Sequence, residues 1–204
     1  MRIACLHTAE SNIAVFEAAR GEGQILLHTL RADLLSRAEA AGGLTEALRD
    51  EAAAVLAGLV DGVDAVLLTC STVGPAVAEV RAAIPVLRVD QALAKAAIAE
   101  AGSKRLRVLY AVATTLAPTQ AIFAAEANAH SRIDYQLVDG AWAKFRAGDV
   151  GGYHQAVAEA ADAAYAEGVA VVALAQASMA GAAARSCSGV PLTSPSAALA
   201  HLRS

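Results

Sequence analysis

The sequence predicts an α/β fold made of two pseudo-symmetric lobes, each a short, mostly parallel sheet flanked by helices. First, short apolar segments alternate with helical patterns along the 204 residues. Second, residues 62–94 align without a gap with residues 168–200, with identical pairs such as Gly62 and Gly168. Third, the chain is 56% hydrophobic but only 4% aromatic, so its core must use Ala, Val, Leu and Ile. Such a core is typical of helices packed closely on a parallel sheet.

Eight segments are predicted to be strands, because they are short and apolar on both faces, as buried parallel strands are. They are residues 2–7, 24–29, 65–69, 86–89, 106–112, 133–138, 169–174 and 191–193. Helical patterns lie between them, and in residues 45–60 Leu48 and Leu56 fall on one face. Residues 151–167 behave in the same way. This alternation predicts βαβ units with right-handed crossovers.

The internal repeat predicts how the chain is divided. A repeat of about 100 residues is too long for a solenoid unit, and it indicates two copies of one half-domain. The seam is expected near Ala101 to Lys104, a run of small residues before a strand. We therefore predict a first lobe over residues 1–102, a second over residues 103–204, and an active-site cleft between them.

Composition excludes several classes of protein. A net charge of -4 gives no electrostatic footprint for nucleic acid or an anionic membrane. The longest uncharged runs, residues 108–125 and 168–184, are too short and too polar for a membrane span. The first residues do not resemble a signal peptide, so a cytoplasmic location is expected. The three cysteines do not form a disulfide pattern, and the histidines lack metal-ligand spacing. A homodimer remains open.

Hydroxyl-rich turns follow the predicted strands, where ligands of open α/β sheets bind. They are residues 7–12, 69–74, 113–120 and 175–179. Each is expected to open a helix, whose N-terminal N–H groups favour a carboxylate or phosphate. No Walker loop or GxGxxG fingerprint is present, so a small carboxylate is favoured over a nucleotide. We expect neither a metal nor an organic cofactor.

Cys70 is the candidate reactive residue, because it stands where a strand is expected to end and a helix to begin. Such a position exposes a thiol partly and favours the thiolate needed for proton transfer or nucleophilic attack. The alternative is a structural cysteine that acts as a small hydrophobe. That structural interpretation is favoured for Cys5, within a strand, and for Cys187, predicted to lie in a helix. In the repeat, Gln176 takes the place of Cys70.

Each half has an apolar strand, a CST or QAS turn, a helix, and then a strand that begins I/V-P-V/L. This pattern resembles the aspartate/glutamate racemase superfamily, which includes hydantoin racemase, maleate isomerase and arylmalonate decarboxylase. The resemblance covers nearly the whole chain and is most specific in TCSTVGPA, residues 69–76. It implies two cysteines that face each other across the α-carbon of a bound carboxylate, and Cys70 would be the first. The residues expected to hold or surround the carboxylate are Ser11, Asn12, Ser71, Thr72, Thr115, Thr119 and Ser178.

Gln176 departs from the superfamily pattern, because an amide cannot exchange a proton near neutral pH. Racemisation by a cysteine pair is therefore not expected. The leading prediction is a racemase or isomerase in which Cys70 transfers a proton or attacks the substrate and Gln176 orients it. A cofactor-free decarboxylase of a substituted malonate is the alternative, although in such members the retained cysteine lies in the second lobe. A non-catalytic sensor of small carboxylates also stays open. His28 and Glu10 are supplementary acid or base candidates.

Overall fold

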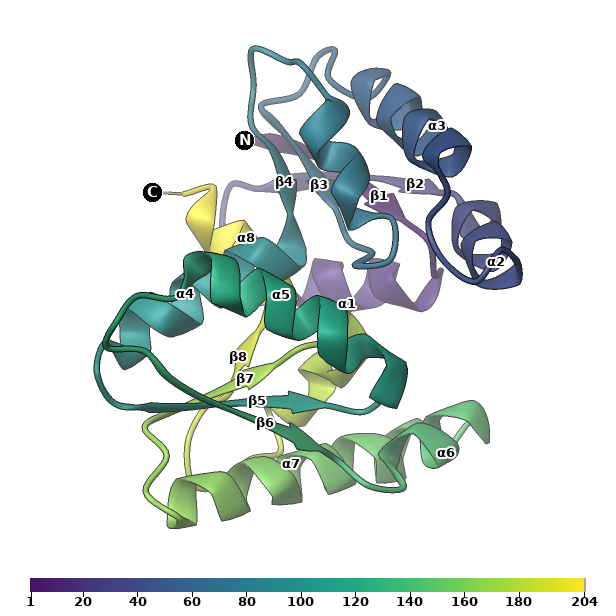
Figure 1. Ribbon diagram of the computed structural model, residues 1–204. Helices are drawn as coiled ribbons and strands as arrows, with labels where there is room; N and C mark the ends of the chain where they lie inside the picture. Colours follow the sequence, from purple (N-terminus) through teal and green to yellow (C-terminus); the bar gives the residue numbers. More distant parts are fainter. Residues whose placement is uncertain (204) are drawn as a thin grey trace. The chain divides into compact units, whose positions relative to one another are not determined.

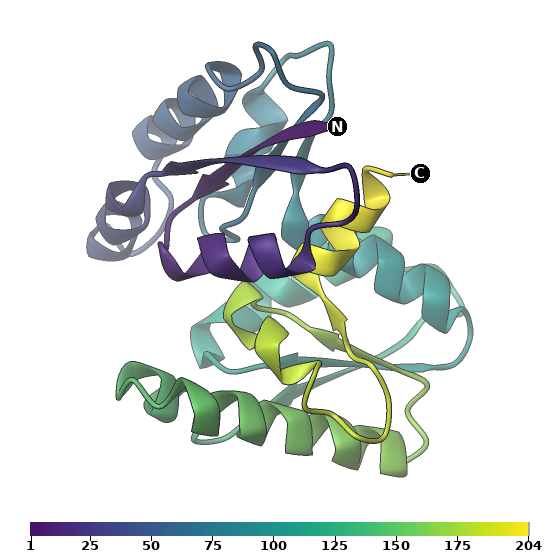
Figure 2. The same ribbon diagram turned by 180° about the vertical axis from the view of Figure 1, so that it is seen from behind.

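The computed structural model describes residues 1–203, which form two four-stranded sheets (Figures 1 and 2). The first sheet has the order β2-β1-β3-β4 and the second β6-β5-β7-β8, and every neighbouring pair is parallel. The strands are β1 (Arg2–His7), β2 (Ile25–Leu30), β3 (Ala65–Leu68), β4 (Val86–Arg88), β5 (Arg105–Tyr110), β6 (Arg132–Leu137), β7 (Val171–Leu174) and β8 (Leu192–Thr193). The predicted α/β class and all eight predicted strands are confirmed.

Helices cover both faces of the first sheet. Successive side chains along a strand point to opposite faces, so neighbouring residues contact different helices. Helices α2 (Ala32–Ala40) and α3 (Glu46–Ala57) lie on one face, and α1 (Ser11–Ala19) lies on the other (Figure 2). Leu6 of β1 is buried in the cluster formed with α2 and α3. Its neighbour His7 points to the opposite face, where its ring meets Phe16 of α1 at a centroid distance of 5.4 Å. Each face of this sheet therefore has its own core.

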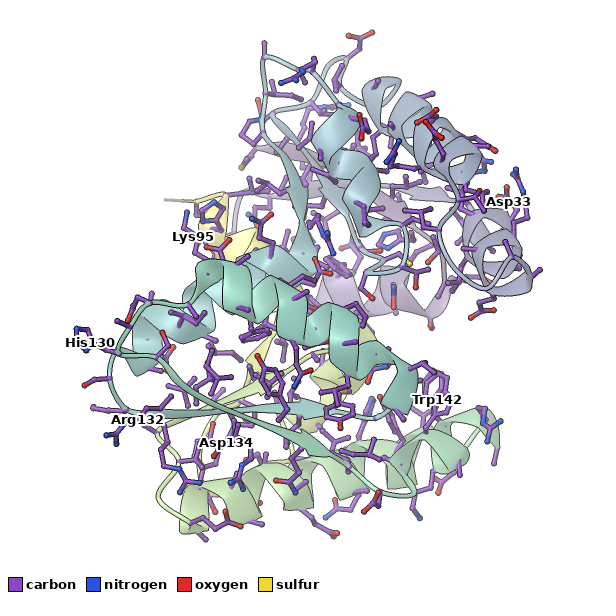
Figure 3. The ribbon with its side chains drawn as sticks, in the orientation of Figure 1. Asp33, Lys95, His130, Arg132, Asp134 and Trp142 are labelled. Carbon is purple, nitrogen blue, oxygen red and sulfur yellow. The ribbon has the colours of Figure 1, made fainter. Side chains whose placement is uncertain are left out.

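The second sheet is covered in the same way. Helices α6 (Ala141–Arg146) and α7 (Val150–Ala166) run along one face, and α5 (Leu116–Glu126) lies across the other (Figure 1). Trp142 on α6, labelled in Figure 3, stacks on Phe145 at a centroid distance of 5.0 Å. Phe145 in turn contacts the fully buried Tyr153 of α7. These three aromatic residues thus join α6 and α7 and pack in one core cluster with strand residues of the sheet.

The two compact units are not divided where the repeat begins again. One comprises Met1–Val89 with the chain from Ala198 onward, and the other comprises Asp90–Ala197. Helix α4 (Val89–Ala101) therefore belongs largely to the second unit, because its buried residues cluster with Leu106 of β5. The last turns of α8 (Ser194–His201) belong to the first unit, where Gln24 donates a hydrogen bond to Leu199 O at 2.9 Å. The predicted boundary between two repeated lobes after residue 102 stays a prediction.

The helices expected directly after Cys70 and Gln176 are short 3-10 segments, η1 (Gly74–Glu79) and η3 (Ala177–Ala182). The proline in the first turn of η1 has no backbone N–H to donate, and η1 must end before β4 begins. Gly74 lies close to Arg88, since a Cβ there would lie 2.5 Å from the guanidinium carbon, and a larger residue would require the Arg88 side chain to move. Cys187 is also not helical, and lies in the exposed loop after η3. The expected helix dipole at Cys70 is therefore small.

Charged side chains line the edge of the second sheet. Asp134 on the edge strand β6, labelled in Figure 3, accepts a hydrogen bond from Arg105 at 2.9 Å and one from Arg107 at 3.4 Å. These bonds hold the pKa of the Asp134 carboxyl below its usual value. Charges on an edge strand oppose pairing with another strand. Within residues 1–203, no helix has both the length and the apolar character that a membrane span requires.

Alanine packing on α7 gives a test of the close-packed core. Ala161 is fully buried against the second sheet, whereas Ala163 on the same helix is exposed. We expect Ala161→Leu to lower the free energy of unfolding by about 1–3 kcal/mol, because the added carbons have no space. Ala163→Leu, the matched control, should change it by less than about 0.5 kcal/mol. Urea unfolding followed by circular dichroism measures both, and equal effects would contradict the packing described here.

Candidate active site at the carboxyl ends of the strands

The sheet order places a topological switch point in each unit. In the first unit β1 lies between β2 and β3, and in the second β5 lies between β6 and β7. Ligands of open parallel sheets bind outside the carboxyl ends of the strands at such a point. Cys70 follows β3 and Gln176 follows β7, so both residues stand beside the switch point of their own unit. The equivalence that the repeat predicted is therefore present in the sheets, while a shared cleft stays a prediction.

Cys70 is half buried, and its sulfur packs against the cluster that contains Val73 and Ala76. The described residues give its thiol no hydrogen-bond partner. Ser71 and Thr72, which follow it, are exposed. The turn thus presents a partly accessible thiol with two free hydroxyl groups beside it. The apolar packing on one side is also what a structural cysteine would show.

Ser11 and Asn12 begin α1, directly after β1, so they stand at the same edge of the sheet as Cys70. Ser11 is exposed and Asn12 is buried. The backbone N–H of Asn12 already donates to Ala9 O at 3.1 Å. Glu10, an acid or base candidate, is exposed and makes no capping hydrogen bond. Side-chain groups therefore contribute more than helix N–H groups to any anion site here.

Gln176 has a fixed orientation, because its side-chain oxygen accepts a hydrogen bond from the backbone N–H of Ala111 at 2.7 Å. Ala111 directly follows β5, so this bond ties together the ends of the two central strands of the second sheet. The described residues give the amide nitrogen of Gln176 no partner. The amide N–H groups of Gln176 are therefore available to donate to a ligand, and the side chain supplies no acid or base near neutral pH.

Two of the other three predicted site residues of the second unit form hydrogen bonds within the protein. The Thr115 hydroxyl donates to Val112 O at 2.6 Å, and Thr119 lies half buried within α5. The Ser178 hydroxyl is 2.9 Å from the Tyr153 hydroxyl. Burial raises the pKa of Tyr153 to about 12, so the phenol stays neutral in this contact. A role of these three hydroxyls in substrate binding stays a prediction, because two of them are already engaged within the protein.

The structure brings together two histidines, the buried His7 and the partly buried His28, which their spacing in the sequence did not predict. His7 Nε2 lies 2.8 Å from His28 Nδ1, His7 Nδ1 lies 2.9 Å from Thr69 Oγ1, and His28 Nε2 lies 3.0 Å from Glu17 Oε1. Burial and the neighbouring His28 lower the pKa of His7 to about 4. The hydrogen bond from His28 lowers the pKa of Glu17. His28 therefore lies in a network on the α1 face, whereas Cys70 packs on the opposite face of the sheet.

Structural comparison supports the class of fold that the two units define. No sequence-family model matches the chain, and no curated protein sequence is significantly similar to it. Among solved structures, aspartate racemase from Picrophilus torridus is similar with a TM-score of 0.72 and 14% identity, covering 98% of this chain and 91% of its own. Allantoin racemase from Klebsiella pneumoniae is similar with a TM-score of 0.73 and 19% identity, covering 100% and 86%.

A third structure, an aspartate racemase homologue from Pyrococcus horikoshii, has a TM-score of 0.66 and 13% identity, covering 99% of this chain and 97% of its own. At such low identity these likenesses establish a common fold. The chain therefore has the fold of the aspartate, allantoin and related racemases, as the CST and QAS turns led us to expect.

The histidine pair predicts a pH dependence of stability. The pKa of His7 lies near 4 in the folded protein against 6.5 ordinarily, so the unfolded chain binds more protons between these values. The contribution of His7 to the free energy of unfolding should be fully present above about pH 6.5. It should be lost as the pH falls toward 4, by up to about 1 kcal/mol per pH unit. Urea unfolding in the presence of a chelator measures this slope.

His7→Gln should flatten that pH dependence, because glutamine does not titrate there. His130→Gln is the matched control, since His130 lies in an exposed loop before β6 (Figure 3). An unchanged slope in His7→Gln would show that other groups cause the acid sensitivity.

Proposed function

We propose that this protein is a racemase-like or isomerase-like enzyme that acts on a small carboxylate through Cys70 and needs no cofactor. One observation carries the proposal: the half-buried Cys70 thiol follows β3, beside the switch point of a racemase-type sheet, with exposed hydroxyl groups next to it. Because one fold can carry many functions, the proposed function rests on the side chains of the turn that contains Cys70.

The proposed reaction begins with the thiolate of Cys70 removing the proton on the carbon next to the substrate carboxylate. The electron pair of the broken C–H bond moves into the carboxylate, which becomes an enediolate with two charged oxygens. Hydrogen-bond donors aimed at those oxygens stabilise that charge as it develops. Ser11, Ser71 and Thr72 offer hydroxyl donors, and Gln176 offers its amide N–H groups. Cys70 or water then returns a proton to the carbon.

Decarboxylation is the second candidate, and the fixed amide of Gln176 favours it. Because Gln176 Oε1 is held by Ala111, this residue can bind a carboxylate but cannot exchange a proton on the other face of the substrate. A substituted malonate would lose carbon dioxide, and Cys70 would deliver one proton to one face of the enediolate. A carboxylate sensor, the third candidate, would bind the same ligands without turnover. Formation of a homodimer also remains a prediction.

Replacement of Cys70 distinguishes the enzyme from the sensor. Cys70→Ser should keep the circular dichroism spectrum and urea midpoint close to those of the native protein, because the change in volume is small. It should lower the exchange of the substrate α-proton, or the release of carbon dioxide, by at least about 10²-fold, because an alcohol is a weaker acid and nucleophile. Proton NMR in deuterated buffer, with a panel of 2-substituted carboxylates and malonates, gives both readouts.

The control is Cys187→Ser, since Cys187 is an exposed loop thiol away from the strand ends. It should leave turnover unchanged. Full turnover in Cys70→Ser would assign Cys70 to packing and would end the proposal.

Replacement of Gln176 distinguishes proton exchange on one face of the substrate carbon from exchange on both faces. Gln176→Cys places a second thiol at the position equivalent to Cys70, and we expect exchange of the α-proton to increase for both enantiomers of a substrate. The variant also loses the hydrogen bond to Ala111, so stability should fall by about 0.5–1.5 kcal/mol. Gln176→Ala is the matched control, because it loses the same bond without gaining a base. If the native protein already racemises the substrate efficiently, another group supplies the second proton.

A further inference from the structure

Three potential metal ligands come together on the α1 face of the first sheet. Cys5 and His28 are register partners on β1 and β2, and His7 lies two residues after Cys5, so all three side chains point to one face. The Cys5 sulfur and one nitrogen of each histidine all lie within 4.8 Å of one another. Cys5 and His7 are fully buried, and His28 lies at the rim with 16% of its side chain exposed.

The outer hydrogen bonds of the two rings orient their lone pairs inward. Thr69 donates to Leu6 O at 3.1 Å, so its oxygen accepts from His7 Nδ1 and leaves His7 Nε2 facing inward. Glu17, whose pKa is lowered, is a carboxylate and accepts from His28 Nε2, which leaves His28 Nδ1 facing inward. Metal-bound histidines nearly always donate their outer N–H to a carboxylate, a backbone carbonyl or water. Here His28 has a carboxylate partner and His7 has a threonine hydroxyl in the same position.

We propose that Cys5, His7 and His28 form a binding site for a zinc-like divalent cation, held by the Cys5 sulfur and by one nitrogen of each ring. Tetrahedral zinc, with bonds of about 2.0–2.3 Å, sets ligand nitrogens about 3.3 Å apart. The two inward nitrogens lie 2.8 Å apart, so the rings need to separate by about half an ångström. The Cys5 sulfur, within 4.8 Å of a nitrogen of each ring, completes the set by a small movement toward them.

Charge and surroundings favour a soft divalent cation over calcium or magnesium. One thiolate and two imidazoles suit zinc, whereas calcium and magnesium prefer oxygen ligands. Binding releases the thiol proton of Cys5, so the thiolate and the Glu17 carboxylate together balance the two positive charges. Phe16 shields the His7 ring on the buried side, and the exposed Glu17 marks the side from which a cation enters.

This site is separate from the Cys70 sulfur, which packs on the opposite face of the sheet, and it does not depend on the proposed reaction. It is nonetheless connected to the turn through Thr69, which binds His7 and precedes Cys70. A bound cation would therefore fix the end of β3 through the His7 ring.

Cobalt(II) titration of the full chain, stripped of metals with a chelator, tests the proposal without any substrate. We expect one cobalt ion per chain, with a thiolate-to-cobalt charge-transfer band, the visible bands of tetrahedral cobalt, and displacement of cobalt by zinc. Cys5→Ser should abolish the charge-transfer band, whereas Cys70→Ser and Cys187→Ser should retain it. A band that depends on Cys70 or Cys187, or the absence of a thiolate band in the native chain, would overturn the proposal.

Glu17→Ala keeps the test decisive if Cys5→Ser fails to fold, because Glu17 is an exposed helix residue whose loss should not prevent folding. Loss of its bond to His28 should weaken cobalt binding by about 10–100-fold, as loss of such outer partners usually does. Glu39→Ala, an exposed position on α2, is the control and should bind as the native chain does. Equal affinity in Glu17→Ala and Glu39→Ala would contradict the site.

Discussion

The parallel pairing of β1 with β3, repeated as β5 with β7, is the constraint on which the candidate site depends. Each pair brings the carboxyl ends of two central strands to one edge of a sheet, at the place where the strand order reverses. Because sequentially distant turns meet there, Ser11 and Cys70 share an edge although many residues separate them. The same pairing sets Gln176 beside the end of β5, where the N–H of Ala111 binds its side chain.

The two units show how one architecture can acquire unequal chemistry. In the first unit, the residue after β3 and its neighbour are Cys70 and Ser71, which leave a thiol and a hydroxyl without internal partners. In the second unit, Gln176 and Ser178 form hydrogen bonds to Ala111 and Tyr153, so these polar groups stabilise the turn. Satisfied groups rigidify a turn, while unsatisfied groups at a partly exposed position are available to a ligand. This difference supports the proposal that the reactive group is Cys70 of the first unit.

The α1 face of the first sheet carries polar groups where an apolar core would be expected. His7 is fully buried, and it persists there because both ring nitrogens have partners. The cost of burying a charge is visible in the low pKa of His7, which keeps this ring neutral at neutral pH. Cys5, fully buried beside the two rings, makes no hydrogen bond among the described residues.

The sequence by itself determined the α/β class, the eight strands, the repeat and the two matched turns, because these features depend on local hydrophobic patterns and on self-similarity. It did not determine that η1 and η3 are short 3-10 segments, because the length of such a segment depends on tertiary packing as well as on local pattern. The cluster of Cys5, His7 and His28 was also beyond the spacing rules, although Cys-x-His within a strand was a local signal. Only the register of β1 against β2 sets His28 opposite Cys5. Likewise, the packing of α4 with the second sheet follows from contacts between buried side chains of distant segments, which no local pattern encodes.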